Sequence, residues 1–265
     1  MKYSVFAEQY LRDNAYRLSS KTMLTYHTTN KFFHAYSKNP NISEITSQLI
    51  NDYINTRSKA QARKDLISLK AMFSYARKLG LLRKNPCDNL QVPRLKRNFP
   101  LIVTKDEFAK FASCIDCSDT KDLIVTAAYT GLRLGELRNL TPANIYGNKI
   151  IITSLKSGRV RSVPMNDAVK SIVDRNLGNK WIFAYKSAQW KERRVQVRFK
   201  KYLKLSGLNQ DLHFHCLRHS FATWLIQSGV NMLYVKELLG HSTLQTTLIY
   251  THFFNKDLES AISSL

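Results

Sequence analysis

The sequence has few acidic residues, few cysteines and no long hydrophobic run. Its 19 Asp and Glu residues stand against 41 Lys and Arg residues, and four cysteines occur among 265 residues. No stretch of about 18 apolar residues is present, and the N-terminus opens no apolar run of signal-peptide length, so we expect neither a transmembrane helix nor a secretory signal. A disulfide framework is not expected either. These absences favour a soluble intracellular protein.

The sequence also lacks the usual marks of metal and nucleotide sites. Cys114 and Cys117 have the spacing of a zinc-binding pair, but no second pair or nearby histidine completes such a site. A plain pair at a helix end is the better interpretation. No P-loop and no cluster of carboxylates occurs. We therefore expect no metal and no cofactor.

Positive charge is in large excess in both halves of the chain. The formal net charge is +22 and the isoelectric point is about 9.9. Residues 1–97 carry 18 Lys and Arg against 6 Asp and Glu, and residues 98–265 carry 23 against 13. The usual partner of such a surface is a polyanion, most often nucleic acid. A basic surface without a partner is the alternative, but its self-repulsion would then go unneutralised.

The first part of the chain has the apolar spacing of helices. A first helix is predicted around Phe6 and Tyr10, and Ser20 and Thr46 are predicted to cap the second and third. The sequence from Ser58 to Gln61 is a capping box for a long fourth helix that ends at Gly80. Residues 92–100 contain two prolines and three basic residues. We interpret them as an interdomain linker rather than as a surface loop.

The second half mixes helices with a small sheet. Thr104 and Glu107 form a capping box, and an apolar helix over 121–130 ends at Gly131. Residues 149–155 and 160–165 are rich in β-formers and predict a hairpin. Helices are predicted over 187–204, 215–228, 231–239 and 243–254. The predicted fold is therefore mainly α with a small antiparallel sheet, in two domains, 1–91 and 101–265, joined by the linker.

Basic side chains near two of these helix ends are candidates for phosphate binding. His215 and Arg218 are three positions apart, so they share one face at the start of a helix. The guanidinium of Arg218 offers a planar fork of donors for two phosphate oxygens. Arg133 follows the break at Gly131, where it can project from a rigid base. Taken alone, Arg133 is better explained as a surface arginine paired with Glu136 than as a catalytic residue.

Three further candidates have common structural explanations. His241 is expected in a tight turn between two helices, and Tyr250 two turns into the second of them, where a core role is the usual one. Lys156 stands at the hairpin tip, as exposed turn lysines often do. The other histidines (27, 34, 213, 219 and 252) are interpreted as structural or surface residues.

The assembled pattern resembles the tyrosine recombinase (phage integrase) family over nearly the whole chain. Thr130–Glu136 matches T-G-x-R-x-x-E, and His215–His219 matches H-x-x-R-H. Leu239–His241 matches L-G-H, and Tyr250 stands 32 positions after Arg218. The resemblance implies a core-binding helical domain, a catalytic domain and a clamp around DNA. The chain begins with the core-binding domain, so the resemblance is to the Xer-like or simple integrases without an arm-binding domain.

The resemblance also implies a mechanism. Tyr250 would attack the scissile phosphate and form a 3′-phosphotyrosyl intermediate, while Arg133, Arg218 and His241 stabilise the charge that develops. His215 would help to move the proton of Tyr250, and Lys156 would protonate the leaving 5′-oxygen. Glu136 would orient the residues of the site without contacting the DNA itself.

The implied partners are double-stranded DNA with specific recombination sites and three further copies of the chain, in a tetramer that forms a Holliday junction. The tail 253–265 would dock on a neighbouring subunit or, alternatively, pack on its own domain. The expected location is the cytoplasm, in association with the nucleoid. Two alternatives share the fold: a DNA-binding regulator without catalysis, and nicking and closing of the type IB topoisomerase kind without strand exchange.

Overall fold

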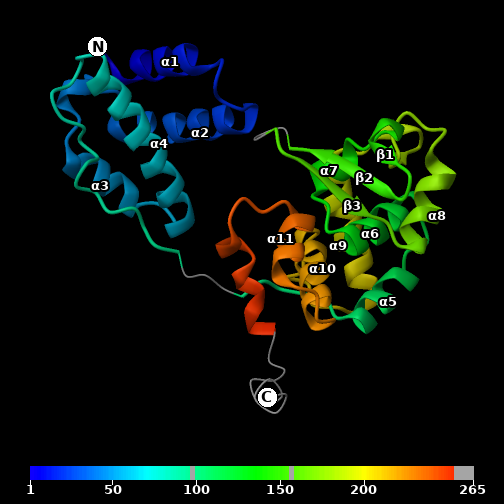
Figure 1. Cartoon of the computed structure of the whole chain (residues 1–265). Coiled ribbons are helices and arrows are strands. Elements are labelled where there is room, and N and C mark those ends of the chain that lie inside the picture. The colour runs from blue at the N-terminus through cyan, green and yellow to red at the C-terminus, as the bar shows by residue number, and fades with distance from the viewer. Residues whose placement is uncertain (96–98, 155–157, 254–265) are drawn as a thin grey trace. The chain divides into compact units, whose positions relative to one another are not determined.

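The computed structural model describes residues 1–95, 99–154 and 158–253, with the backbone alone for 251–253. The chain forms two compact units, one ending at Arg97 and one beginning at Asn98. Helices make up most of both units, and the small sheets are antiparallel (Figure 1). The predicted fold class is confirmed. No helix in these ranges is long and apolar enough to cross a membrane.

The first unit is a bundle of four helices with an aromatic core. Its elements are α1 (Tyr3–Asn14), α2 (Ser20–Ser37), the 3₁₀ turn η1 (Ile42–Glu44), α3 (Ser47–Asn55) and α4 (Lys59–Lys78). The rings of Tyr3, Phe33 and Tyr53 meet edge to face at 4.9–5.1 Å, which adds to the free energy of their burial. Thr46 and Ser58 cap α3 and α4 as predicted. The second helix is capped by Ser19 and not by Ser20.

A buried carboxylate ties three helices of this bundle together. Asp65 on α4 is inaccessible to solvent and accepts hydrogen bonds from Thr29 on α2, Tyr53 on α3, Arg57 and Gln61. A carboxylate that replaces its lost water with four donors can be buried at moderate cost.

We expect Asp65→Ala to lower the free energy of unfolding by about 3 kcal/mol, because it leaves these buried donors without an acceptor. Asp88→Ala is the matched control, since Asp88 forms an exposed pair with Arg77 at 3.4 Å. Its expected effect is below about 0.5 kcal/mol. Calorimetric unfolding of the full chain measures both, and equal effects would contradict the role given to Asp65.

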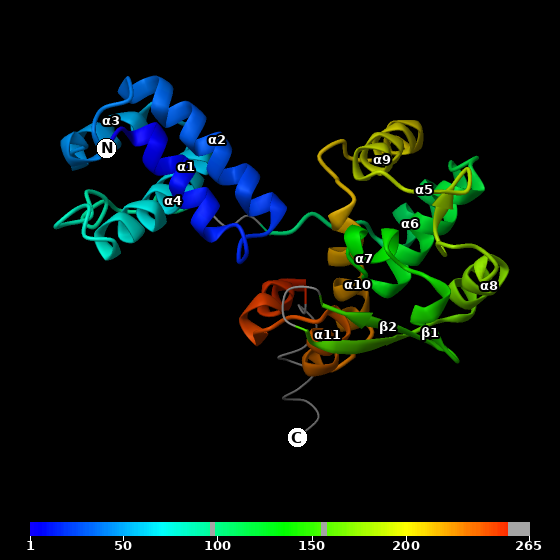
Figure 2. The ribbon, with the colours of Figure 1, turned by 90° about the horizontal axis from the view of Figure 1, so that it is seen from above.

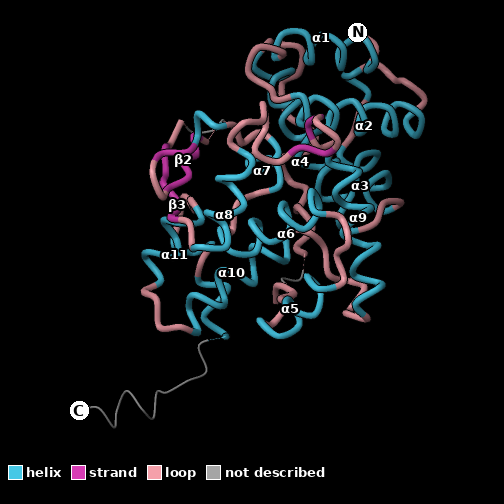
Figure 3. Tube along the Cα trace, turned by 90° about the vertical axis from the view of Figure 1, so that its right-hand side faces the viewer, coloured by secondary structure: helices cyan, strands magenta, loops and turns pink. Residues whose placement is uncertain are grey.

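The second unit packs its helices around a central pair, α6 (Ser118–Thr130) and α10 (His215–Gln227). Strands β1 (Ile145–Tyr146), β2 (Lys149–Thr153) and β3 (Val160–Pro164) form an antiparallel sheet in chain order, with Ile150 opposite Val163 and Ile152 opposite Arg161. Figure 3 shows β2 and β3 in magenta at one edge of the unit, with α11 (Met232–Leu239) beside β3. The other elements are α5 (Lys105–Ser113), α7 (Leu134–Arg138), η2 (Pro142–Asn144), α8 (Asp167–Asn176), β4 (Ala184–Tyr185), β5 (Ala188–Gln189), α9 (Glu192–Ser206), η3 (Leu244–Thr246) and η4 (Leu248–Phe253).

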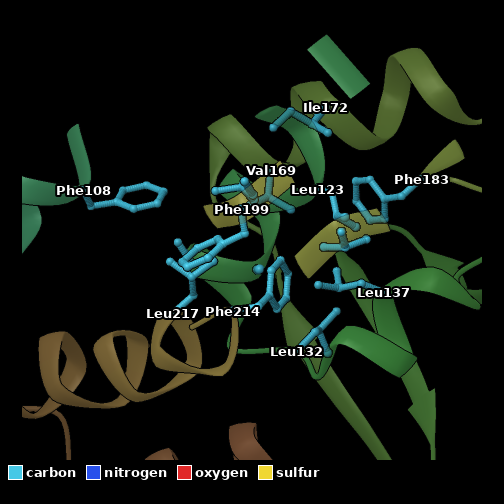
Figure 4. Packing of buried hydrophobic residues seen from close by; sticks show 14 of the residues in the cluster. Phe108, Leu123, Leu132, Leu137, Val169, Ile172, Phe183, Phe199, Phe214 and Leu217 are labelled. Carbon is cyan, nitrogen blue, oxygen red and sulfur yellow. The ribbon is translucent and has the colours of Figure 1, made fainter. Parts of the chain in front are cut away.

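The core of this unit fixes both α7 and the residues just before it. Leu132 and Leu137 are 1% and 0% exposed and lie in one buried cluster with Phe214 and Leu217 (Figure 4). The start of the unit is held to α10 by two hydrogen bonds: the backbone N–H of Val103 donates to Oγ of Ser220, and Nε1 of Trp224 donates to the carbonyl of Val103.

Several local predictions for this unit were right and others were wrong. The capping box at Thr104, the hairpin of β2 and β3 and the helix α10 are confirmed. The helix predicted over 187–204 begins only at Glu192, because residues 184–189 form the hairpin β4–β5. Helix α8 was not predicted. The helix predicted over 243–254 is wrong: two short 3₁₀ turns, η3 and η4, take its place, and Thr243 makes no capping hydrogen bond.

Candidate active site

A sharp backbone turn places Arg133 at the start of α7. Gly131 ends α6 with φ +62°, and a Cβ atom there would lie 2.4 Å from the Phe221 ring, so both the conformation and the packing require glycine. Glu136 accepts the backbone N–H of Arg133 at 2.7 Å and its guanidinium at 3.0 Å. The Arg133 side chain is 44% exposed, so it can still reach a ligand outside.

Behind Arg133 lies a second arginine that the sequence patterns did not single out. Arg161 on β3 binds both oxygens of Glu136, at 2.7 and 3.0 Å, and its side chain is 8% exposed. Its Nε donates to the carbonyl of Leu238 at the end of α11. Burial alone raises the pKa of Glu136, but the hydrogen bonds from Arg161 and from the Arg133 backbone outweigh it and lower that pKa below its ordinary value. Glu136 is therefore an anion held between two arginines.

Arg218 is nearly inaccessible and braces two helix ends. Its Nη1 donates to the carbonyl of Gly131 at 2.6 Å and its Nη2 to the carbonyl of Leu239. Burial, followed by the charge of Arg133, lowers its pKa to about 9, so it stays a cation at neutral pH. From the sequence, the guanidinium of Arg218 was expected to bind two phosphate oxygens, yet in this structure each of its terminal nitrogens already donates a hydrogen bond to a backbone carbonyl. Each also has a second N–H that these contacts do not use.

His241 follows α11 at the turn held by these arginines. Gly240 has φ +64°, and a Cβ atom there would approach Cδ of Arg161 to 2.9 Å. Nδ1 of His241 lies 2.9 Å from Oγ1 of the buried Thr247. The predicted tight turn is thus present, although a 3₁₀ turn and not an α-helix follows it.

Tyr250 is buried against α10 and α11. It is 1% exposed and packs with Phe221, Val235 and Leu239. Figures 1 and 2 both show the red turns η3 and η4 beside α10. Its hydroxyl oxygen lies 2.7 Å from Nδ1 of His219. Burial raises the pKa of Tyr250 to about 12 while Arg218 opposes this increase, so at neutral pH the residue is a phenol.

The three histidines of this region are neutral at pH 7. Burial removes water from all three rings and is the main reason why the pKa of His215, His219 and His241 falls to about 4. The second cause is the charge of Arg218 for His215 and His241, and the charge of His215 for His219. The rings of His215 and His219 meet edge to face at 4.9 Å. His219, which was interpreted as structural or surface, therefore lies between His215 and Tyr250.

The second unit therefore contains Arg133, Glu136, His215, Arg218, His241 and Tyr250 in one electrostatically connected region. Lys156 lies outside the described residues, as does the tail from 254 on. No group of His, Cys, Asp and Glu that could hold a metal ion occurs among the residues that are described. A set of cations around a phenol suits attack on a phosphodiester, because the cations can stabilise the charge that builds up on its oxygens.

Comparisons with known proteins agree with this chemistry. The model of the phage integrase family matches residues 103–256. A tyrosine recombinase of Thermosipho africanus is 33% identical over 208 residues, which cover 75% of this chain and 73% of the relative. The tyrosine recombinase XerA of Pyrococcus horikoshii is 32% identical over 205 residues, covering 73% and 70%.

Solved structures show the same fold. A lambda integrase fragment in a dimer bound to a core site superposes with a TM-score of 0.82 at 20% identity, over 93% of this chain and 97% of that one. A Tn1549 transposon integrase in complex with transposon end DNA gives a TM-score of 0.80 at 21% identity, over 100% and 98%. The chain belongs to the phage integrase family of tyrosine recombinases.

Proposed function

We propose that this recombinase cuts and rejoins specific DNA sites through Tyr250. The phenolic oxygen attacks the scissile phosphorus, giving a 3′-phosphotyrosyl bond and a free 5′-hydroxyl, and the linkage then passes to another strand through a Holliday junction. The observation that supports this most directly is the setting of Tyr250: its hydroxyl oxygen lies 2.7 Å from Nδ1 of the neutral His219, and the charge of Arg218 acts to lower its pKa. Because the phosphodiester energy is kept in the tyrosyl bond, no nucleotide has to be hydrolysed.

The surrounding residues have distinct proposed roles. Arg133 and Arg218 stabilise the non-bridging oxygens of the pentacoordinate state, and His241 donates a further hydrogen bond; removing one such donor typically costs about 3–4 kcal/mol of activation free energy. His215, at the exposed start of α10, helps with proton transfer, and Lys156 protonates the leaving 5′-oxygen. Glu136, together with Arg161, orients Arg133.

The proposed assembly is a homotetramer on two paired DNA sites. Both units carry net positive charge, so phosphate contacts supply much of the affinity. In this proposal residues 1–91 are the core-binding domain, 92–100 the linker and 101–265 the catalytic domain. A structural relative, lambda integrase, has been solved as a tetramer bound to a Holliday junction. The tail 253–265 would dock on a neighbouring subunit, since its apolar residues at helical spacing need a covering surface.

The test of this function is the covalent intermediate. Incubation with a nicked suicide substrate in excess EDTA and without ATP is expected to give a protein–DNA adduct on a denaturing gel, with Tyr250 as the modified residue in mass spectrometry. The expectation follows because cationic side chains take the place of metal ions at the phosphate. An adduct that disappears with EDTA and returns with Mg²⁺ would contradict the mechanism. Supercoil relaxation without strand exchange on paired sites would favour the topoisomerase alternative.

A further inference from the structure

His219 makes the closest recorded contact to the nucleophilic oxygen. Its Nδ1 lies 2.7 Å from Oη of Tyr250, which is the separation of a good hydrogen bond. Within the ranges that the structure describes, no other hydrogen bond to this oxygen is recorded. The ring is half-buried, and it approaches the phenol ring with 5.7 Å between centroids. A basic nitrogen is thus aimed at the proton that the nucleophile has to lose.

His215 and His219 are four positions apart and therefore lie on the same side of α10. They differ in exposure: His215, at the first turn, is the more exposed of the two, whereas His219 is half-buried where η4 packs on α10. No contact between His215 and Tyr250 is recorded for the described residues. The two histidines therefore have different surroundings: His219 contacts the hydroxyl of Tyr250, whereas His215 can contact a phosphate that binds from the solvent side.

Burial, together with the charges around it, keeps the ring of His219 neutral. The groups that face it are His213 and His215 at the start of α10, Arg218 on the same helix, His241 after α11 and Tyr250 on η4. Burial, followed by the charges of His215, His213 and Arg218, lowers its pKa to about 4, while burial raises the pKa of Tyr250 to about 12. At rest the proton therefore stays on the phenol, and Nδ1 is available as an acceptor when the other ring nitrogen carries the proton of the neutral imidazole.

We propose that His219, the residue in contact with Oη, is the general base that takes the proton of Tyr250 directly during cleavage, so that the help from His215 is indirect. The O–H bond of Tyr250 breaks as Oη bonds to phosphorus, and the proton passes to Nδ1 of His219. The bond from phosphorus to the 5′-oxygen breaks with its electron pair on that oxygen, which takes a proton from the acid of the site. In rejoining, the 5′-hydroxyl returns its proton to the acid of the site as its oxygen bonds to phosphorus, the bond from phosphorus to Oη breaks, and Tyr250 recovers its proton from His219. This inference rests on the proposed function.

The experiment measures single-turnover cleavage of a suicide substrate from pH 6 to pH 9 for the wild type, His219→Asn and His219→Gln. Asn places an amide oxygen close to the position of Nδ1, so a hydrogen bond is kept while the basic nitrogen is lost. Cleavage by His219→Asn at pH 7 is expected to fall about 10²-fold, the usual contribution of a general base. Its rate should then rise about tenfold per pH unit, because the phenolate fraction rises below a pKa of about 12, whereas the wild-type rate stays flat.

Two further measurements separate a base from a structural residue. A substrate with sulfur at the bridging 5′ position has a leaving group that needs no acid, so it should rescue a variant that lacks the acid and leave His219→Asn slow. The matched control is His213→Asn, on an exposed ring of the same helix start that contacts Cys216 and not Tyr250. It is expected to cleave within about twofold of the wild type.

Three results would overturn the proposal: His219→Asn cleaving like the wild type, a slower variant that keeps the flat profile, or rescue by the sulfur substrate. Melting temperature and DNA binding identify variants that fail to fold. If the His219 variants fail to fold, the wild type alone still tests the proposal: a wild-type cleavage rate that rises tenfold per pH unit would overturn the role of His219 as the base. A wild type that forms no adduct would instead refute the proposed function.

Discussion

Tyr250→Phe is expected to abolish the covalent adduct and to leave DNA binding within about twofold of the wild type. The variant loses a single oxygen atom, while its ring still fills the space among Phe221, Val235 and Leu239. No other group of the site can take over the nucleophilic role, so adduct formation should fall by more than about 10⁴-fold. The lost hydrogen bond to His219 should cost about 1 kcal/mol of stability.

Adduct yield on a suicide substrate, read on a denaturing gel beside a filter-binding titration, measures both quantities. Tyr234→Phe is the matched control, because Tyr234 on α11 is 64% exposed and belongs to no part of the site. It should retain full cleavage. A full-strength adduct from Tyr250→Phe would remove this residue from its proposed role.

Arg218→Ala is expected to lose both cleavage and stability. Cleavage should fall about 10³-fold, because a preorganised cation at the transition state is lost. The change also leaves the carbonyls of Gly131 and Leu239 without their donor, and both lie in the buried turns that carry Arg133 and His241. Unpaired buried carbonyls typically cost about 1–3 kcal/mol each, so the free energy of unfolding should fall by about 2–4 kcal/mol.

Arg133→Ala is the comparison that separates these two effects. The Arg133 side chain is 44% exposed and, among the described residues, donates to the carboxylate of Glu136 and not to a carbonyl, so its loss should slow cleavage by a similar factor with little change in stability. Both variants should bind DNA nearly as well as the wild type, because one phosphate contact among many contributes little. Single-turnover cleavage, melting temperature and filter binding are the three measurements. Equal melting temperatures for the two variants would show that Arg218 does not brace the turns.

Where a sequence pattern acts within a few residues, prediction was accurate at most helix starts, although Ser19 and not Ser20 caps the second helix. Thr46, Ser58 and Thr104 cap their helices because a side-chain oxygen reaches an amide three positions on, whatever the rest of the chain does. The hairpin of β2 and β3 and the helix of the H-x-x-R-H motif follow from local spacing in the same way. The order and spacing of Arg133, His215, Arg218, His241 and Tyr250 were enough to predict the family and the chemistry.

What only the tertiary structure decided depends on partners far apart in the chain. Arg161 shows no pattern along its strand, and its role comes from Glu136, 25 positions earlier, and from Leu238, 77 positions later. The turns η3 and η4 replace the predicted helix around Tyr250, where His241 contacts Thr247 and His219 contacts Tyr250. The contact between His219 and Tyr250 was not predicted for the same reason, since the two residues are 31 positions apart. Local spacing selects a helix and its caps, but a side chain's hydrogen-bond partner across the core is determined only when the helices pack.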